Sequence, residues 1–205
     1  MIIAVDGPAA SGKGTIAKAL AQHYGLPHLD TGMLYRAVGV ATAQMGGNPD
    51  DPADALKGAA FPESLLDDPA LRHEAAGGLA SRVSIHPAVR AALLARQRDF
   101  AAQTAGAIID GRDIGSVIVP LADAKLFVTA RPEIRAERRH REDPTGDYDA
   151  ILADIRQRDE RDSARSAAPL VRAADADLLD TSDLTIDAAV QRAIALVDAR
   201  IRDRR

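Results

Sequence analysis

The feature that most constrains the fold is a glycine-rich loop near the start of the chain. The loop reads GPAASGKGT at residues 7–15, follows the β-branched run MIIAVD and precedes a helix-like segment. This order favours a loop whose backbone N–H groups surround a phosphate, with the positive end of the helix dipole at the same point. Lys13 can reach the outer phosphates of a nucleotide. We therefore predict that the phosphates of a nucleotide are bound by Gly7, Pro8, Ala9, Ala10, Ser11, Gly12, Lys13, Gly14 and Thr15.

One residue of the loop departs from the common pattern. Gly14 stands where a Ser or Thr hydroxyl usually holds Mg²⁺, and Thr15 is expected to contact a phosphate instead. We therefore expect that side chains form no metal site, and that Mg²⁺ arrives with the nucleotide, bound mainly by phosphates and water. The chain also lacks the N-K-x-D or T-K-x-D sequence with which GTPases read their base. These features favour a small-molecule kinase over a GTPase or an ATPase motor.

Short apolar runs alternate with helix-like segments along the rest of the chain. The runs predict strands at residues 1–6, 28–30, 107–110, 124–130 and 176–181. Periodicity, prolines and glycines predict helices at residues 15–24, 33–45, 71–83, 88–103, 132–141, 149–165 and 186–201. The proline-rich stretch 48–68 is expected to form a loop or short helices. This alternation predicts an α/β fold, with a small parallel sheet flanked by helices on both faces.

Composition excludes several classes of protein. With 205 residues, 46% hydrophobic and 27% charged, the chain is expected to form one globular domain rather than a disordered chain or a rod. The absence of Cys excludes disulfides and thiolate-bound metals. A net charge of −4 and 3% aromatic residues disfavour a nucleic-acid partner. Since we find neither a membrane-length apolar run nor a signal peptide, we expect a cytoplasmic location and no membrane partner. We also expect a monomer.

Two further segments place charged residues where a second substrate could bind. In the sequence DTGMLYR at residues 30–36, Thr31 could cap a helix and Arg36 could reach an acceptor phosphate. In DGRD at residues 110–113, two acids and an Arg follow a buried strand. Ligands of open α/β sheets bind beyond the carboxyl ends of strands, and charges buried there are costly unless paired or used.

Residues 131–165 are rich in charge of both signs. They contain nine Arg and ten acidic residues, so they do not form a stripe for a polyanion. Most of these charges are expected to pair at i,i+3 and i,i+4 on two solvated helices. A minority could face inward if the helical hairpin closes over a nucleotide as a lid. The five His show no metal-ligand spacing and are expected to be structural or exposed.

Taken together, these segments resemble the bacterial cytidylate kinases, the CMP/dCMP kinases of the nucleoside monophosphate kinase superfamily. The resemblance runs through VDGPAASGKGT (5–15), LDTGMLYR (29–36), ASRVSIHPAVRAALL (80–94), DGRDIG (110–115) and RDERDSARSAAPL (158–170). It implies transfer of the γ-phosphoryl group of ATP to CMP or dCMP, giving ADP and CDP or dCDP. It also implies a P-loop kinase fold with a core (1–43, 84–130, 166–205), a nucleoside monophosphate (NMP)-binding insert (44–83) and an Arg-rich lid (131–165). Residues 46–70 are too short and proline-rich for the small β-sheet that longer family members carry there.

The resemblance assigns roles to residues at matching positions. Cytosine would be read by Ser81, Arg90 and Asp113. The CMP phosphate would be surrounded by Thr31, Arg36 and Arg112. The ribose would be contacted by Arg158 and Asp162, while Arg165 would lie near the phosphate and the sugar. The loop residues 7–15 would bind the ATP phosphates. Lys13, Arg112, Arg158 and Arg165 would be catalytic. The chemistry of the base agrees, because the cytosine amino group suits the Asp113 carboxylate and its acceptors suit Arg90. Uracil would leave both mismatched, at about 1–3 kcal/mol per buried group.

Two other interpretations stay open at this point. One is a P-loop kinase with a different acceptor, such as UMP, AMP or a small metabolite, and exchange of Asp113 or Arg90 would then not alter base choice. The other is a nucleotide-gated binding protein without kinase activity, which would bind ATP without a second nucleotide. The preference between CMP and dCMP also stays open.

Overall fold

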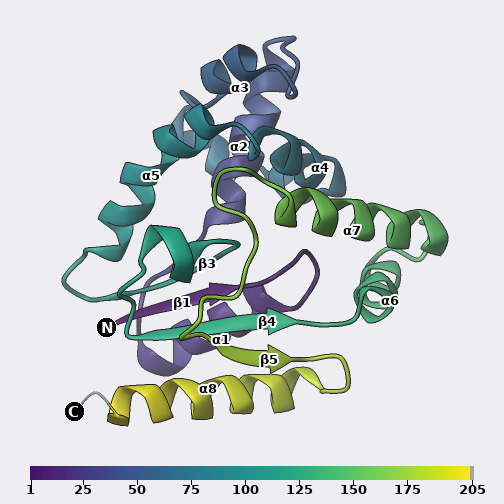
Figure 1. Ribbon diagram of the computed structural model, residues 1–205. Helices are drawn as coiled ribbons and strands as arrows, with labels where there is room; N and C mark the ends of the chain where they lie inside the picture. Colours follow the sequence, from purple (N-terminus) through teal and green to yellow (C-terminus); the bar gives the residue numbers. More distant parts are fainter. Residues whose placement is uncertain (204–205) are drawn as a thin grey trace. The chain divides into compact units, whose positions relative to one another are not determined.

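The computed structural model describes residues 1–203 and contains a five-stranded sheet (Figure 1). Its strands are β1 (Ile2–Asp6), β2 (His28–Asp30), β3 (Ala107–Gly111), β4 (Ala124–Thr129) and β5 (Asp177–Asp180), in the order β2-β3-β1-β4-β5. The pairs β1–β3, β1–β4 and β4–β5 are parallel. Because β1 is central, the loop that follows it lies between the carboxyl ends of β3 and β4. The expected α/β fold and its five strands are confirmed.

Two helices cover one face of this sheet. The helices α1 (Lys13–Tyr24) and α8 (Ile186–Asp203) pack against each other and against the strands (Figure 1). Their apolar faces share a fully buried cluster with β1 and β4, which includes Leu20, Val197 and Val5. The terminal helix predicted from its apolar periodicity is therefore confirmed, and this core fixes the start of α1 against β1.

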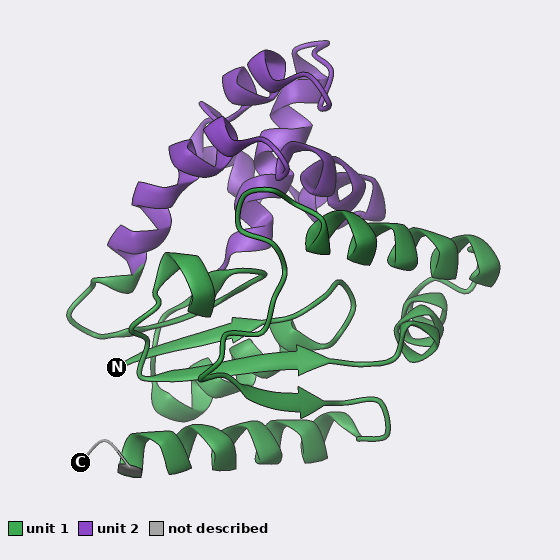
Figure 2. Cartoon of the chain, viewed as in Figure 1, with its two compact units in different colours: residues 1–29, 101–205 green, residues 30–100 purple. Residues whose placement is uncertain are grey.

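The described chain divides into two compact units (Figure 2). One combines residues 1–29 with the chain from 101 onward, and the other comprises residues 30–100. The second unit contains α2 (Thr31–Gln44), α3 (Pro52–Gly58), the 3₁₀ helices η1 (Glu63–Asp67) and η2 (Pro69–Arg72), α4 (Glu74–Val83) and most of α5 (Pro87–Ala101). Its own core gathers Leu34, Val38 and Ala55. The division of the chain into core, insert and lid stays a prediction.

The start of α2 differs from expectation. The helix begins at Thr31 instead of residue 33, and its cap is Asp30, whose carboxylate accepts a hydrogen bond from the Gly32 N–H at 2.9 Å. Thr31, which we expected to cap this helix, is instead its first residue and is buried. An Asp side chain reaches the N–H two residues ahead as readily as a Thr does, so the sequence alone did not decide between neighbours.

The proline-rich stretch forms short helices, as expected. Residues 46–70, all of which the structure describes, contain α3 and two 3₁₀ helices and no strand, so the small sheet of longer family members is missing. The Asp51 carboxylate caps α3 by accepting the N–H groups of Ala53 and Asp54 at 2.9 and 3.0 Å.

The remaining elements of the first unit follow the strands β3 and β4. A short π-helical segment, η3 (Ile114–Ile118), follows β3, and it was not predicted. The helices α6 (Pro132–Glu142) and α7 (Tyr148–Ser163) follow β4 and pack against each other (Figure 1). Within residues 1–203, none of the helices combines the length and the apolar character that crossing a bilayer requires.

Candidate nucleotide-binding site

The glycine loop has the conformation of a phosphate cradle. β1 ends at Asp6 and α1 begins at Lys13, so the predicted order of strand, loop and helix is present. Gly7 has a φ of 155°, and a Cβ there would lie 2.0 Å from the Val128 carbonyl oxygen, so no larger residue fits. Ala10 and Gly12 adopt left-handed φ values of 56° and 87°. Such turns direct successive backbone N–H groups toward one point, which is how a loop binds an anion.

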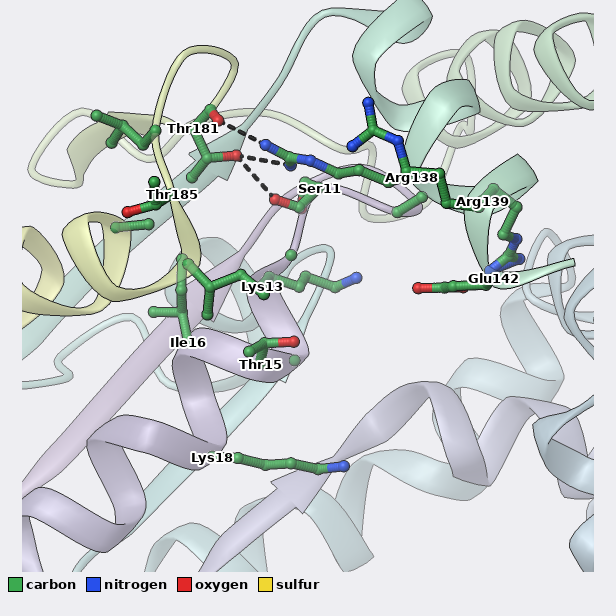
Figure 3. A pocket seen from close by; sticks show the side chains of 17 residues that line it. Ser11, Lys13, Thr15, Ile16, Lys18, Arg138, Arg139, Glu142, Thr181 and Thr185 are labelled. Atoms are coloured by element: carbon green, nitrogen blue, oxygen red, sulfur yellow. Dashed lines mark hydrogen bonds between the residues drawn. The ribbon is translucent and has the colours of Figure 1, made fainter. Parts of the chain in front are cut away.

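A cavity of about 630 Å³ lies in front of this loop (Figure 3). This volume lies within the range of small-molecule sites. One wall is the loop with the start of α1, and the opposite walls are the end of α6 and the segment 181–189. Five basic side chains and one acidic side chain line it: Lys13, Lys18, Arg138, Arg139, Arg141 and Glu142. This excess of positive charge suits a polyphosphate. Sequence analysis had assigned no residue of 181–189 to the site, because that segment is nearly 170 positions from the loop.

Side chains of other elements, some of which also line the cavity, hold the loop by its carbonyl groups. Arg138 donates to the Thr181 hydroxyl and carbonyl oxygens at 3.0 and 2.6 Å, and that hydroxyl donates to the Ser11 carbonyl at 3.1 Å (Figure 3). Arg135, which is 2% exposed, donates to the Ala9 carbonyl at 3.1 Å. Since two carbonyls of the loop are engaged from outside, its backbone is fixed before any ligand arrives.

Arg135 also shows that the charged helices pair differently from our expectation. It forms a two-pronged ion pair with Asp159 of α7, and Arg156 of α7 pairs with Glu133 of α6 at 2.8 Å. Pairs at i,i+4 are also present, such as Arg141 with Glu137. The expectation that most of these charges pair within one helix was therefore incomplete, because α6 and α7 pack side by side and carry opposite charges at the contact.

Lys13 projects into the cavity from the first turn of α1 (Figure 3). Its Nζ donates to the Pro8 carbonyl at 3.4 Å, so the side chain folds back over the loop. Its positive charge opposes the rise that burial causes in the pKa of Asp6, and it adds to the lowering of the pKa of Asp162 by Arg112 and Arg165. Lys13 therefore lies where a phosphate bound in the loop would meet it.

Three of the residues predicted on the acceptor side meet within the first unit. Asp162 of α7 accepts from Arg112 Nε at 2.8 Å and lies 3.5 Å from Arg165 Nη2. Burial of Asp162 would raise its pKa, but the charges of Arg112 and Arg165 outweigh burial and hold the pKa below its usual value. The group is therefore an ionised carboxylate between two guanidinium groups.

Two other predicted residues of this unit, Arg158 and Asp113, are buried and lie close in sequence to the cluster of Arg112, Asp162 and Arg165. Arg158 lies one turn before Asp162 on α7, is 6% exposed and pairs with Asp154 at 2.9 Å. Asp113 follows β3, is 4% exposed and precedes η3. Buried charged side chains at the carboxyl end of a strand and on a neighbouring helix are the arrangement expected of a polar ligand site.

The other predicted acceptor residues belong to the second unit. Arg36 donates to the carbonyls of Leu71 and His73 at 2.7 and 3.4 Å, so it joins α2 to η2. Arg90 is 9% exposed, its guanidinium carbon lies 5.5 Å from the centre of the Tyr35 ring, and it donates to the Ser84 carbonyl at 3.4 Å. Thr31 and Ser81 are also buried. Sequence analysis had given Tyr35 no role, although it stands within one of the segments that carry the resemblance.

Comparison with known families decides the classification. The sequence profile described as "Cytidylate kinase" matches residues 3–199. The chain belongs to the cytidylate kinase family. Among the curated relatives, a cytidylate kinase of Xanthobacter autotrophicus is 58% identical over 204 residues, which is 98% of each chain. One of Azorhizobium caulinodans is 56% identical over 202 residues, which is 97% of this chain and 98% of the relative.

Solved structures support the fold of this cytidylate kinase family member. A gluconokinase from Sinorhizobium meliloti superposes with a TM-score of 0.57 at 15% identity, covering 98% of this chain and 94% of the other. An uncharacterized protein from Eubacterium ventriosum gives 0.60 at 16% identity, covering 97% and 99%. At such low identity the likeness concerns the fold alone, and it agrees with the expected P-loop kinase fold.

Nowhere in the part of the chain up to residue 203 do three His, Cys, Asp or Glu side chains gather as a metal site requires.

Proposed function

We propose that this chain is a cytidylate kinase that transfers the γ-phosphoryl group of ATP to CMP or dCMP, giving ADP and CDP or dCDP. The observation that carries the proposal is the family match over nearly the whole chain, with curated cytidylate kinases at 58% and 56% identity. The basic cavity in front of the phosphate loop supports it, because a P-loop kinase needs such a cavity for its donor.

On the donor side, the loop residues Gly7–Thr15 hold the ATP phosphates with their backbone N–H groups. Lys13 supplies positive charge at the outer phosphates, and Arg138 and Arg139 face the same cavity from α6. Mg²⁺ comes with ATP, held by phosphates and water, and supplies further charge stabilisation of the transferring group. The segment 181–186 is the remaining wall, against which the nucleoside of ATP is expected to pack.

On the acceptor side, the roles follow the resemblance. Asp113, Arg90 and Ser81 read cytosine, while Thr31, Arg36 and Arg112 hold the CMP phosphate. Arg158, Asp162 and Arg165 hold the ribose and spread charge near the acceptor phosphate. The cluster of Arg112, Asp162 and Arg165 supports this assignment, since both guanidinium groups lie beside the one carboxylate of Asp162.

The chemistry requires positioning rather than a covalent step. The CMP phosphate is largely ionised at neutral pH, so its oxygen attacks the γ-phosphorus without a general base. Lys13, Arg112, Arg158 and Arg165 stabilise the charge of the transferring group, and alignment of donor and acceptor lowers the entropy cost.

The same proposal covers organisation and location. Residues 131–165, with α6 and α7, would act as the lid, residues 44–83 as the acceptor insert, and the rest as the core. The enzyme would work as a cytoplasmic monomer, where ATP and nucleoside monophosphates are its small-molecule partners.

The test is ADP formation from ATP and Mg²⁺ with CMP, dCMP, UMP, AMP and GMP in parallel. Fast turnover with CMP and dCMP, and little with the others, supports the proposal. Turnover with a different nucleotide keeps the kinase and refutes the base assignment. If no nucleotide in the panel is phosphorylated, the proposal is wrong, and ATP binding measured without an acceptor then tests the nucleotide-gated binding protein.

A further inference from the structure

Asp6, the last residue of β1, forms a pair of contacts that the proposed function has not used. Its side chain is 5% exposed. Its Oδ1 accepts the backbone N–H of Ile114 and its Oδ2 accepts that of Gly115, each at 2.8 Å. One carboxylate therefore binds two successive N–H groups from a segment more than a hundred residues away.

These two N–H groups belong to the first turn of η3, whose N-cap residue is Asp113. An Asp at this position commonly caps its own helix. Here the cap is supplied by Asp6, and the Asp113 side chain makes no capping hydrogen bond to η3. Asp6 thus takes over the capping of η3 from the residue that we assign to cytosine.

Lys125 of β4 also lies close to Gly115 of this segment. The Lys125 ammonium donates to the Pro120 carbonyl at 2.6 Å and to Asp175 at 2.7 Å. A Cβ on Gly115 would lie 3.1 Å from Lys125 Cδ and 3.3 Å from Asp6 Oδ2. A methyl group at Gly115 would therefore require Lys125 or Asp6 to shift by a few tenths of an ångström, which disturbs this contact.

We infer that Asp6 is a positioning residue for the acceptor nucleotide, and that it sets where Asp113 stands relative to the phosphate loop. The geometry supports this because Asp6 immediately precedes Gly7, and Gly7 is fixed against the Val128 carbonyl of β4. The donor loop and the acceptor-reading segment thus depend on the same strand end. The inference rests on the proposed function, since it names what Asp113 reads.

The variant Asp6→Asn tests the inference, because Asn keeps the shape but replaces one acceptor oxygen with an amide that meets an N–H. The rate of ADP formation is measured while the concentration of CMP, UMP or ATP is varied. We expect the KM for CMP to rise about tenfold and the preference for CMP over UMP in kcat/KM to fall by about as much. The KM for ATP should change by less than about twofold, because the loop is also held by Val128, Arg135 and Thr181.

Two further variants keep the test decisive. Gly115→Ala disturbs the same contact from the other partner, and it should raise the KM for CMP in the same way even if Asp6→Asn folds poorly. Asp123→Asn is the matched control, because Asp123 accepts the Ile2 N–H at 2.7 Å at the opposite end of β1. Asp123→Asn should leave the kinetics with both substrates unchanged.

Three results would each overturn the role of Asp6. The first is an equal rise in the KM values for CMP and ATP, and the second is a fall in kcat with both KM values unchanged. The third is normal kinetics of both Asp6→Asn and Gly115→Ala. Normal kinetics of these variants in an otherwise active enzyme would leave the proposed function standing. A wild-type chain that phosphorylates no CMP would refute both the proposed function and this inference.

Discussion

The buried carboxylate of Asp6 also makes a prediction about stability. Burial raises the pKa of Asp6 from 3.8 to about 6, because desolvation and the nearby Asp113 charge outweigh the Ile114 and Gly115 N–H groups and Lys13. The ionised form that binds these two N–H groups near pH 7 is therefore costly for the fold. Asn is the uncharged counterpart of the protonated carboxyl, so Asp6→Asn removes the cost of ionisation.

The sign follows from proton binding in the two states. Between pH 3.8 and about 6, the folded chain keeps the proton on Asp6 and the unfolded chain has lost it, so wild-type stability falls as pH rises. The shift of about two units corresponds to about 3 kcal/mol, lost in full above the folded-state pKa. About half of this change lies between pH 5 and pH 8. The difference between the free energies of unfolding of Asp6→Asn and the wild type should thus shift in favour of Asp6→Asn by about 1.5 kcal/mol from pH 5 to pH 8.

Urea denaturation of both chains at several pH values between 5 and 8 measures this difference, because the other titrating groups cancel in the comparison. The Asp6→Asn chain should gain stability over the wild type as pH rises from 5 through about 6, and the difference should level off above about pH 7. If the stability difference between the two chains is constant with pH, or shrinks toward pH 8, then ionisation of Asp6 does not destabilise the fold and the argument is refuted. A variant that is more stable near pH 8 and binds CMP more weakly would show stability given up for acceptor positioning.

The other predictions concern the site and the core of the second unit. Lys13→Ala should reduce kcat by about a hundredfold or more with an unchanged melting temperature, and normal turnover would refute the phosphate-loop assignment. Asp113→Ala should lower kcat/KM for CMP by about tenfold or more and for UMP much less, whereas equal losses in the two-substrate assay would argue against base reading. Gly39→Ala should destabilise the chain by about 1–3 kcal/mol in urea, because its Cβ would lie 2.6 Å from Leu79 Cβ, and an unchanged midpoint would show that α2 and α4 can separate.

Local patterns in the sequence were sufficient to place most elements. β2 was predicted with its exact bounds, and α8 begins at Ile186 as expected, because β-branched runs, prolines and periodic apolar residues act over a few positions. The phosphate loop could be placed for the same reason, since its glycines and its lysine lie within a single run of nine residues. The π-helical turn η3 carries no such local signal, and it is held by Asp6 from a distant strand.

The contacts that shape the site lie between residues far apart in the chain. Arg135 and Ala9 are separated by 126 positions, and Thr181 and Ser11 by 170. Charge patterning along one helix predicted pairs between neighbours, but it could not show that α6 would face α7 and the loop. The wall at residues 181–189 was missed for the same reason, because only the closing of β5 beside β4 brings it to the cavity.

The structure explains why the carboxyl end of β1 is a suitable place for a two-substrate reaction. The loop after β1 is held through the Ala9 and Ser11 carbonyls, and the segment after β3 is held through Asp6. Both attachments are made by protein groups of the first unit, so the loop and the segment after β3 need no substrate to order them. Phosphoryl transfer depends on alignment and on fixed charges, and it gains most from such preorganisation. Because Asp6 and Gly7 are adjacent in the chain, the end of β1 fixes the distance between the loop and the segment after β3 to within a few bonds.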